Sequence, residues 1–298
     1  MRRPSSVELM LLATIVLWAL NLSVTRYILT HGFDPLSYAT VRYGFAGLIF
    51  VCLTLAIERT LRVERSQLPL LGLAAVLLCL NQLAFVFALD VTTASTIGLV
   101  LGAIPIFAAI FGLVLGTERP DGRFWLAASV SAVGVACVAA GSSGELGHDL
   151  GGILLGLVTA ATWAAYSVAV APLMRSISPS RMSAIVVPAA WVGLALVGLP
   201  QTSGQSWGVG WQIWVLMAFA IVGPLVVTNV LWFRSIHRIG ANRATLAANL
   251  EPFVAALLAV VLLSEPLSAL QVAGGVLIGC GILVVRRRAP APPAAQAA

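Results

Sequence analysis

The sequence predicts an all-α, polytopic membrane protein whose ten transmembrane helices form two inverted five-helix repeats. Three observations lead to this prediction. Of the 298 residues, 60% are hydrophobic and only 9% are charged, whereas about a quarter of the residues in a soluble domain are charged. Apolar segments long enough to cross a bilayer follow one another along nearly the whole chain. Arginines occur at every second connection, and landmark residues of the first half recur in the second.

The first five predicted spans are residues 9–29, 36–57, 67–89, 93–115 and 123–140. Each approaches the roughly 20 apolar residues that a helix needs to cross the hydrocarbon core. The first span follows Arg2 and Arg3 but continues without a small-residue cleavage site, so we expect a retained helix and not a signal peptide. Charged or turn-forming segments bound these spans, at residues 31–35, 58–65, 118–123 and 141–147.

The remaining predicted spans are residues 151–171, 182–199, 211–233, 242–263 and 267–285. A Ser178-Pro179 turn separates the first two of them, and a Pro- and Gly-bounded segment at 200–210 precedes the third. The sequence thus provides ten crossings and leaves no room for a separate soluble domain.

The arginines predict the orientation. The N-terminus, every second connection and the C-terminal tail contain fifteen of them, and the intervening connections contain none: Arg2, Arg3, Arg59, Arg62, Arg65, Arg119, Arg123, Arg175, Arg181, Arg234, Arg238, Arg243, Arg286, Arg287 and Arg288. Short cytoplasmic loops are enriched in basic residues, so we expect both termini in the cytoplasm. The basic pI of about 9.8 then reflects topology and not nucleic-acid binding, which needs basic residues on one exposed face.

The two halves of the chain resemble each other. Thirteen residues separate Pro105 from Glu118, and the same number separates Pro252 from Glu265. Trp18 and Trp163 stand at matching places before two further prolines. These landmarks divide the chain into repeats at residues 1–145 and 146–298. An odd number of crossings in each repeat inverts the second relative to the first, an arrangement typical of transporters that work by alternating access.

Four segments carry a resemblance to a known family: LWALNLSVTRYI, FDPLSYATVRYGFAGL, IPIFAAIFGLVLGTE and EPFVAALLAVVLLSE. On these segments the chain resembles the drug/metabolite transporter superfamily, with two EamA-type domains covering nearly all of it. Two features depart from the family pattern. Thr117 and Ser264 replace a glycine that often precedes the glutamate, and the second repeat lacks an arginine matching Arg42.

The resemblance implies a ten-helix inner-membrane exporter of amino acids, related metabolites, amines or drugs that works without ATP. A lipid or lipid-linked metabolite translocase of the same fold and a passive channel are the alternatives. An enzyme is not expected, because the spans contain a single deep carboxylate and no HExxH or aspartate-rich motif.

Substrate sites of inverted-repeat carriers lie near the bilayer midplane. Trp18, Pro105, Trp163 and the Glu251-Pro252 pair stand at the centres of their predicted spans. The prolines predict helix kinks. Asn21 and Tyr166 lie three residues from the two tryptophans and are expected on the same helix faces, and Asn81 and Asn249 are further polar candidates.

Glu251 is the strongest candidate, because an ionised carboxylate at the centre of a span costs about 3 kcal/mol on insertion scales. It either carries a proton and shapes the kink, couples transport to protons, or pairs with an amine of the substrate. Arg42 lies outward of the centre of its span, within snorkelling reach of the interface, and is a candidate partner for a substrate carboxylate. Gly98 and Gly102 either line the passage or allow close helix packing.

No cofactor or metal is expected. The four cysteines lie in apolar runs without a CxxC spacing, and the three histidines are scattered through connecting segments. We expect a small-molecule substrate and the lipid bilayer as partners. The sequence leaves open the substrate, the direction of transport, the use of protons and the oligomeric state, for which a monomer suffices.

Overall fold

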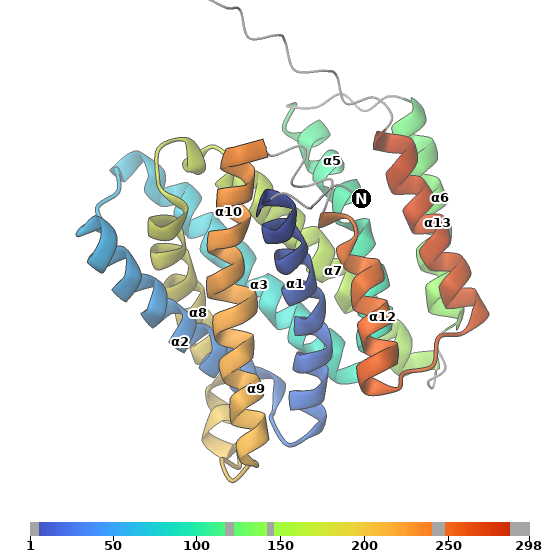
Figure 1. Cartoon of the computed structure of the whole chain (residues 1–298), viewed down its shortest axis with the longest axis horizontal. Coiled ribbons are helices and arrows are strands. Elements are labelled where there is room, and N and C mark those ends of the chain that lie inside the picture. The colour runs from blue at the N-terminus through green and yellow to red at the C-terminus, as the bar shows by residue number, and fades with distance from the viewer. Residues whose placement is uncertain (1–5, 117–121, 142–145, 240–247, 287–298) are drawn as a thin grey trace, which may run out of the picture.

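A computed structural model describes residues 6–116, 122–141, 146–239 and 248–286. Every regular element in these ranges is helical, as predicted (Figure 1). Eight helical segments are long and apolar enough to cross a membrane, and two shorter apolar helices, Glu251–Leu263 and Ala269–Gly281, complete the set. Each segment coincides with a predicted span to within a few residues, although the start of the predicted span at 242–263 lies outside the described residues.

The first half contains three uninterrupted helices, a broken fourth span and a fifth helix. They are α1 (Ser6–Thr30), α2 (Pro35–Glu58), α3 (Leu68–Val91), α4 (Ala94–Val100) continued by the short η2 (Leu101–Ala103) and α5 (Ile104–Val114), and α6 (Gly122–Gly141). The second half follows the same plan with a further interruption. Its helices are α7 (Leu146–Val170), α8 (Pro179–Gly204), α9 (Trp211–Ile221) joined through the π-helical η4 (Val222–Val227) to α10 (Thr228–Ile239), α12 (Glu251–Leu263) and α13 (Ala269–Arg286).

Helices α2 and α8 pack side by side and run in opposite directions. At one end of the α2 and α8 pair, the Gln201 side chain accepts a hydrogen bond of 2.9 Å from the Leu36 backbone N–H. At the other end, Arg181 forms a 2.6 Å ion pair with Glu58. The start of each helix therefore lies beside the end of its partner.

Two further matched pairs show the same antiparallel packing. The start of α4 is bonded to Glu265, just beyond the end of α12, and Gly98 lies against Ala255 near the other end of the contact. This close approach explains Gly98 and Gly102 as packing residues, because a side chain there would meet α12 or α13. Helices α6 and α13 pair at one edge of the molecule (Figure 1).

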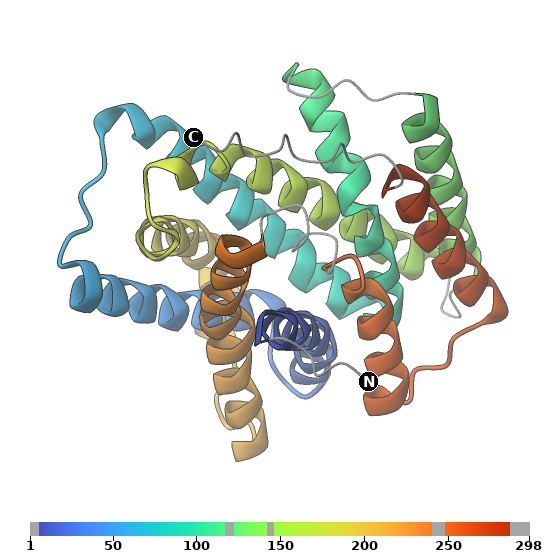
Figure 2. The same cartoon turned by 45° about the horizontal axis from the view of Figure 1, so that its top comes forward.

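The first helix of each half packs against helices of the other half. The central helix α1 packs against α10 and α12, while α7, its counterpart, packs against α3 and α5. Figure 2 shows α1 near the middle of the bundle, with α2 and α10 on one side and α12 on the other. The interior next to α1 and α7 is therefore where all the broken spans meet.

Candidate functional site

Three spans are interrupted at the same level of the bundle. The span of α4 and α5 breaks at η2, just before Pro105, and α12 begins at Glu251 after a turn at 249–250. Both prolines stand in the first turn of a helix, where the regular α-helical hydrogen bonding is interrupted. The third interruption is η4, which contains Pro224. The prediction missed it, although the Gly223-Pro224 pair inside an apolar span is a known breaker signal.

A cavity of about 130 Å³ lies where these breaks meet. Its lining comes from both halves: Trp18, Asn21, Leu22, Arg42, Tyr43, Asn81, Gln82, Phe85, Leu101, Ile104, Thr159, Trp163, Pro224, Leu225 and Glu251. We call this cavity the central pocket. Interrupted backbone is tolerated at membrane depth where it lines a cavity, and this arrangement surrounds the substrate sites of several transporter folds.

Six predicted residues line the central pocket together: Trp18, Asn21, Arg42, Asn81, Trp163 and Glu251. Two predicted residues do not. Tyr166 packs against Trp163, with the ring centroids 5.5 Å apart, and Asn249 lies in the turn before α12. Pro105 and Pro252 shape the backbone around the cavity without lining it. Several lining residues that the sequence analysis did not predict, such as Leu22 and Phe85, stand four positions from predicted ones. The spacing of residues on one helix face could therefore have identified them.

Arg42 differs from its expected position. Only 3% of its surface is exposed, so it does not snorkel to the interface but points inward. Its Nε donates to the Ala220 carbonyl at 3.2 Å and its Nη1 to Gln82 Oε1 at 3.5 Å. The guanidinium carbon also lies 5.7 Å from the ring centroid of Tyr38 and 6.0 Å from that of Tyr43. These aromatic and carbonyl groups stabilise the cation inside the bundle.

A chain of side-chain hydrogen bonds extends from Arg42 across the wall of the central pocket. Gln82 accepts from Arg42 and donates through Nε2 to Asn81 Oδ1 at 3.0 Å. Asn81 then donates to the Thr159 carbonyl of α7 at 2.8 Å. The wall thus ties α2, α3 and α7 together, and its amides fix the orientation of the guanidinium.

Trp18 is held on the opposite wall. Its Nε1 donates to Thr228 Oγ1 at 3.1 Å, and that hydroxyl donates to the Pro224 carbonyl at 2.6 Å. The Trp18 ring also packs against Trp232, with the ring centroids 5.2 Å apart. The indole therefore joins α1 to the interrupted η4 and α10 span.

Asn21 and Glu251 supply acceptors for a ligand. Asn21 is 7% exposed, and its Oδ1 has no hydrogen-bond partner. Glu251 and Arg42 both line the central pocket, and among the described residues no ion pair joins them to each other. The pocket can therefore present a guanidinium, a carboxyl group and a free acceptor to a small polar solute. Within the described ranges, no three His, Cys, Asp or Glu side chains are grouped for a metal ion.

Comparison with known proteins gives consistent matches over almost the whole chain. The model of the EamA-like transporter family matches residues 5–140 and 150–287. The uncharacterized transporter YdeK of Bacillus subtilis (strain 168) is 26% identical over 295 residues, covering 92% of this chain and 94% of its own. The uncharacterized transporter YwfM of the same organism is 25% identical, covering 84% of each chain. A crystal structure with 21% sequence identity superposes with a TM-score of 0.65, covering 94% of this chain and 96% of that one, and shows the shared fold.

Proposed function

Because the chain belongs to the EamA-like transporter family and is thus a multi-pass membrane transporter, we propose that it exports small metabolites through the central pocket without ATP hydrolysis. In this proposal the two shorter helices α12 and α13 also cross the bilayer, which gives ten spans. The arginine distribution supports an inner-membrane location with both termini in the cytoplasm.

The proposed mechanism is alternating access by two inverted repeats. The antiparallel packing of α2 with α8, of α4 with α12 and of α6 with α13 supports the inverted relation. In such a bundle, rocking of one repeat against the other converts an inward-facing site into an outward-facing one of similar energy. A single chain contains the entire central pocket, so a monomer suffices for this mechanism.

We infer the solute class from the charges in the central pocket. A buried guanidinium needs an anion or strong acceptors, and a buried carboxylate needs a cation or a proton. Because Arg42 and Glu251 do not pair with each other, a solute with a carboxylate and an amine can satisfy both. The indoles of Trp18 and Trp163 add ring faces for an apolar portion or a cation. Amino acids and related amines have this chemistry.

The size of the central pocket supports a small solute over the alternatives. Drug-sized ligands occupy pockets of about 300 to 1,000 Å³, whereas this cavity measures about 130 Å³. A lipid-linked metabolite would also need an apolar site open to the bilayer at the same place. We therefore prefer a small zwitterion or amine to a lipid translocase.

We propose that Glu251 couples solute movement to protons. It is the first residue of α12 and lines the central pocket, so one carboxylate can bind a substrate amine in one step and a proton in another. This exchange allows the proton gradient to drive export of the solute.

Proteoliposomes provide the direct test. Purified protein is reconstituted and presented with labelled amino acids and amines, with and without a pH gradient. The proposal expects saturable uptake of at least one such solute and counterflow when unlabelled solute is placed inside. Non-saturable flux without counterflow would instead indicate a passive channel.

A further inference from the structure

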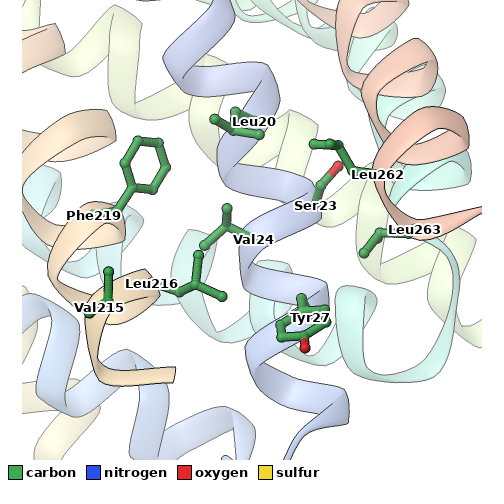
Figure 3. A pocket seen from close by; sticks show the side chains of 9 residues that line it. All are labelled: Leu20, Ser23, Val24, Tyr27, Val215, Leu216, Phe219, Leu262 and Leu263. Atoms are coloured by element: carbon green, nitrogen blue, oxygen red, sulfur yellow. The ribbon is translucent and has the colours of Figure 1, made fainter. Parts of the chain in front are cut away.

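A second cavity lies on the opposite side of α1 from the central pocket. It has a volume of about 430 Å³ and is lined by Leu20, Ser23, Val24, Tyr27, Val215, Leu216, Phe219, Leu262 and Leu263. Figure 3 shows α1 as its floor, with α9 on one side and α12 on the other. We call this cavity the lateral groove. Its lining is apolar except for two hydroxyl groups, so it does not suit the polar solute of the central pocket.

The lateral groove faces the lipid phase. Its residues belong to helices that are apolar enough to lie in a membrane, and Val215 and Leu262 on its rim are 56% and 53% exposed. Hydrocarbon chains are the solvent for such a surface. The groove lies toward the end of α1 that leads to Phe33, whose ring packs against the exposed indoles of Trp207 and Trp214. Tryptophans of this kind mark the membrane–water interface.

Ser23 is an unusual residue on this floor. It is 2% exposed, and its Oγ has no hydrogen-bond partner. An unpaired buried hydroxyl costs roughly 1 to 3 kcal/mol, so a ligand that pairs with it gains binding energy. Ser23 lies four residues before Tyr27, which corresponds to about 6 Å along the helix. A suitable ligand therefore combines an apolar chain with an acceptor oxygen slightly below the interface.

We propose that the lateral groove binds one acyl chain of a glycerophospholipid, whose ester carbonyl accepts a hydrogen bond from the Ser23 hydroxyl. The hydrocarbon chain then contacts Leu216, Phe219 and Leu262, while the headgroup lies near Tyr27 and the exposed tryptophans. The bound lipid supports the back of α1, whose front carries Trp18 and Asn21. This site is independent of the solute that the central pocket transports.

The first experiment maps lipid contacts on the full-length protein. The protein is placed in nanodiscs of phosphatidylethanolamine and phosphatidylglycerol containing a trace of phosphatidylglycerol with a photoreactive acyl chain. Labelling is expected to concentrate on residues 20–27 and 262–263 and to fall when excess unlabelled phosphatidylglycerol competes. Val24→Trp fills the groove and should remove this labelling. Leu126→Trp, the matched change at an exposed position on α6, should leave it unchanged.

Uniform, non-saturable labelling of all lipid-facing helices would overturn the proposal. Thermal unfolding of both variants in detergent verifies that the tryptophans do not prevent folding. If Val24→Trp does not fold, the competition experiment on the unmodified protein still decides between saturable and non-saturable binding.

The second experiment tests the hydrogen bond from both sides. An ether-linked phosphatidylglycerol lacks the ester carbonyl, so the unmodified protein should bind it about 3- to 10-fold more weakly than the ester lipid. Ser23→Ala should weaken binding of the ester lipid by a similar factor and should no longer distinguish the two lipids. Equal binding of ester and ether lipids by the unmodified protein would contradict the role of Ser23.

Discussion

Glu265 accepts hydrogen bonds from the Ser95 backbone N–H at 2.9 Å and from the Ser95 hydroxyl at 2.8 Å. A second carboxylate oxygen accepts from the Ala94 N–H at 3.0 Å. The negative group thus stands at the N-terminus of α4, where the unpaired N–H groups and the helix dipole favour an anion. This contact joins the start of α4 to the segment that follows α12.

We expect Glu265→Ala to lower the free energy of unfolding by about 2 kcal/mol, because several charge-assisted hydrogen bonds are lost at once. The measurement is thermal or denaturant unfolding in detergent. Asp34→Ala is the matched control and should have a much smaller effect, because Asp34 is exposed and its side chain makes no capping hydrogen bond to α2. Equal stability of the Glu265 variant and the unmodified protein would show that this cap is unimportant.

The sequence predicted the helices well because membrane spans depend mainly on apolar length and on the position of charges. It placed Trp18, Trp163 and Glu251 at one depth, and the structure brings all three to the same cavity. Depth along the membrane can be counted from residue numbers. That count needs no knowledge of how the helices pack.

The direction in which a side chain points is harder to predict, because it depends on the neighbouring helices. Arg42 has the depth of a snorkelling residue, but Ala220 and Gln82 on other helices hold it inside. Tyr166 has the spacing of a pocket residue, but its ring packs against that of Trp163 and does not line the central pocket. Only the packed structure provides this information.

Arg42→Gln should separate solutes by their charge. We expect uptake of a solute with a carboxylate to fall about ten-fold or more, because a desolvated charge partner is lost. Uptake of an amine without a carboxylate should change much less. The measurement is the initial rate in proteoliposomes at several solute concentrations. An equal loss for both solutes would assign Arg42 a structural role and not a recognition role.

Glu251→Gln should abolish the response to a pH gradient. The glutamine retains the shape and polarity of the side chain but does not exchange a proton, so the driven and undriven rates should become equal. The unmodified protein should transport the solute faster when the proton gradient drives protons in the direction opposite to the movement of the solute. Glu64→Gln serves as the matched control. An unchanged rate and an unchanged pH profile for Glu251→Gln would leave this residue only the task of shaping the start of α12.

Asn21→Leu should improve stability and impair transport. The change removes a buried acceptor without a partner, which can raise the free energy of unfolding by about 1 kcal/mol. The same change removes the acceptor that we assign to the solute, so KM should rise several-fold. Both quantities are measurable on one preparation. Lower stability would mean that Asn21 supports the packing of α1, and an unchanged KM would remove it from the solute site.

The hydrogen bond from Trp18 to Thr228 provides the sharpest test of the wall formed by α1 and the interrupted η4 and α10 span. Trp18→Phe retains an aromatic ring but loses the Nε1 donor, and Thr228→Val removes the acceptor with little change in shape. Each change should lower the transport rate by about 3- to 10-fold, the range expected for one hydrogen bond. The double variant should lose less than the product of the two single losses, because both changes remove the same contact, although Thr228→Val also removes the bond to the Pro224 carbonyl. Fully multiplicative losses would show that the two residues act separately and that this bond does not couple α1 to the broken span.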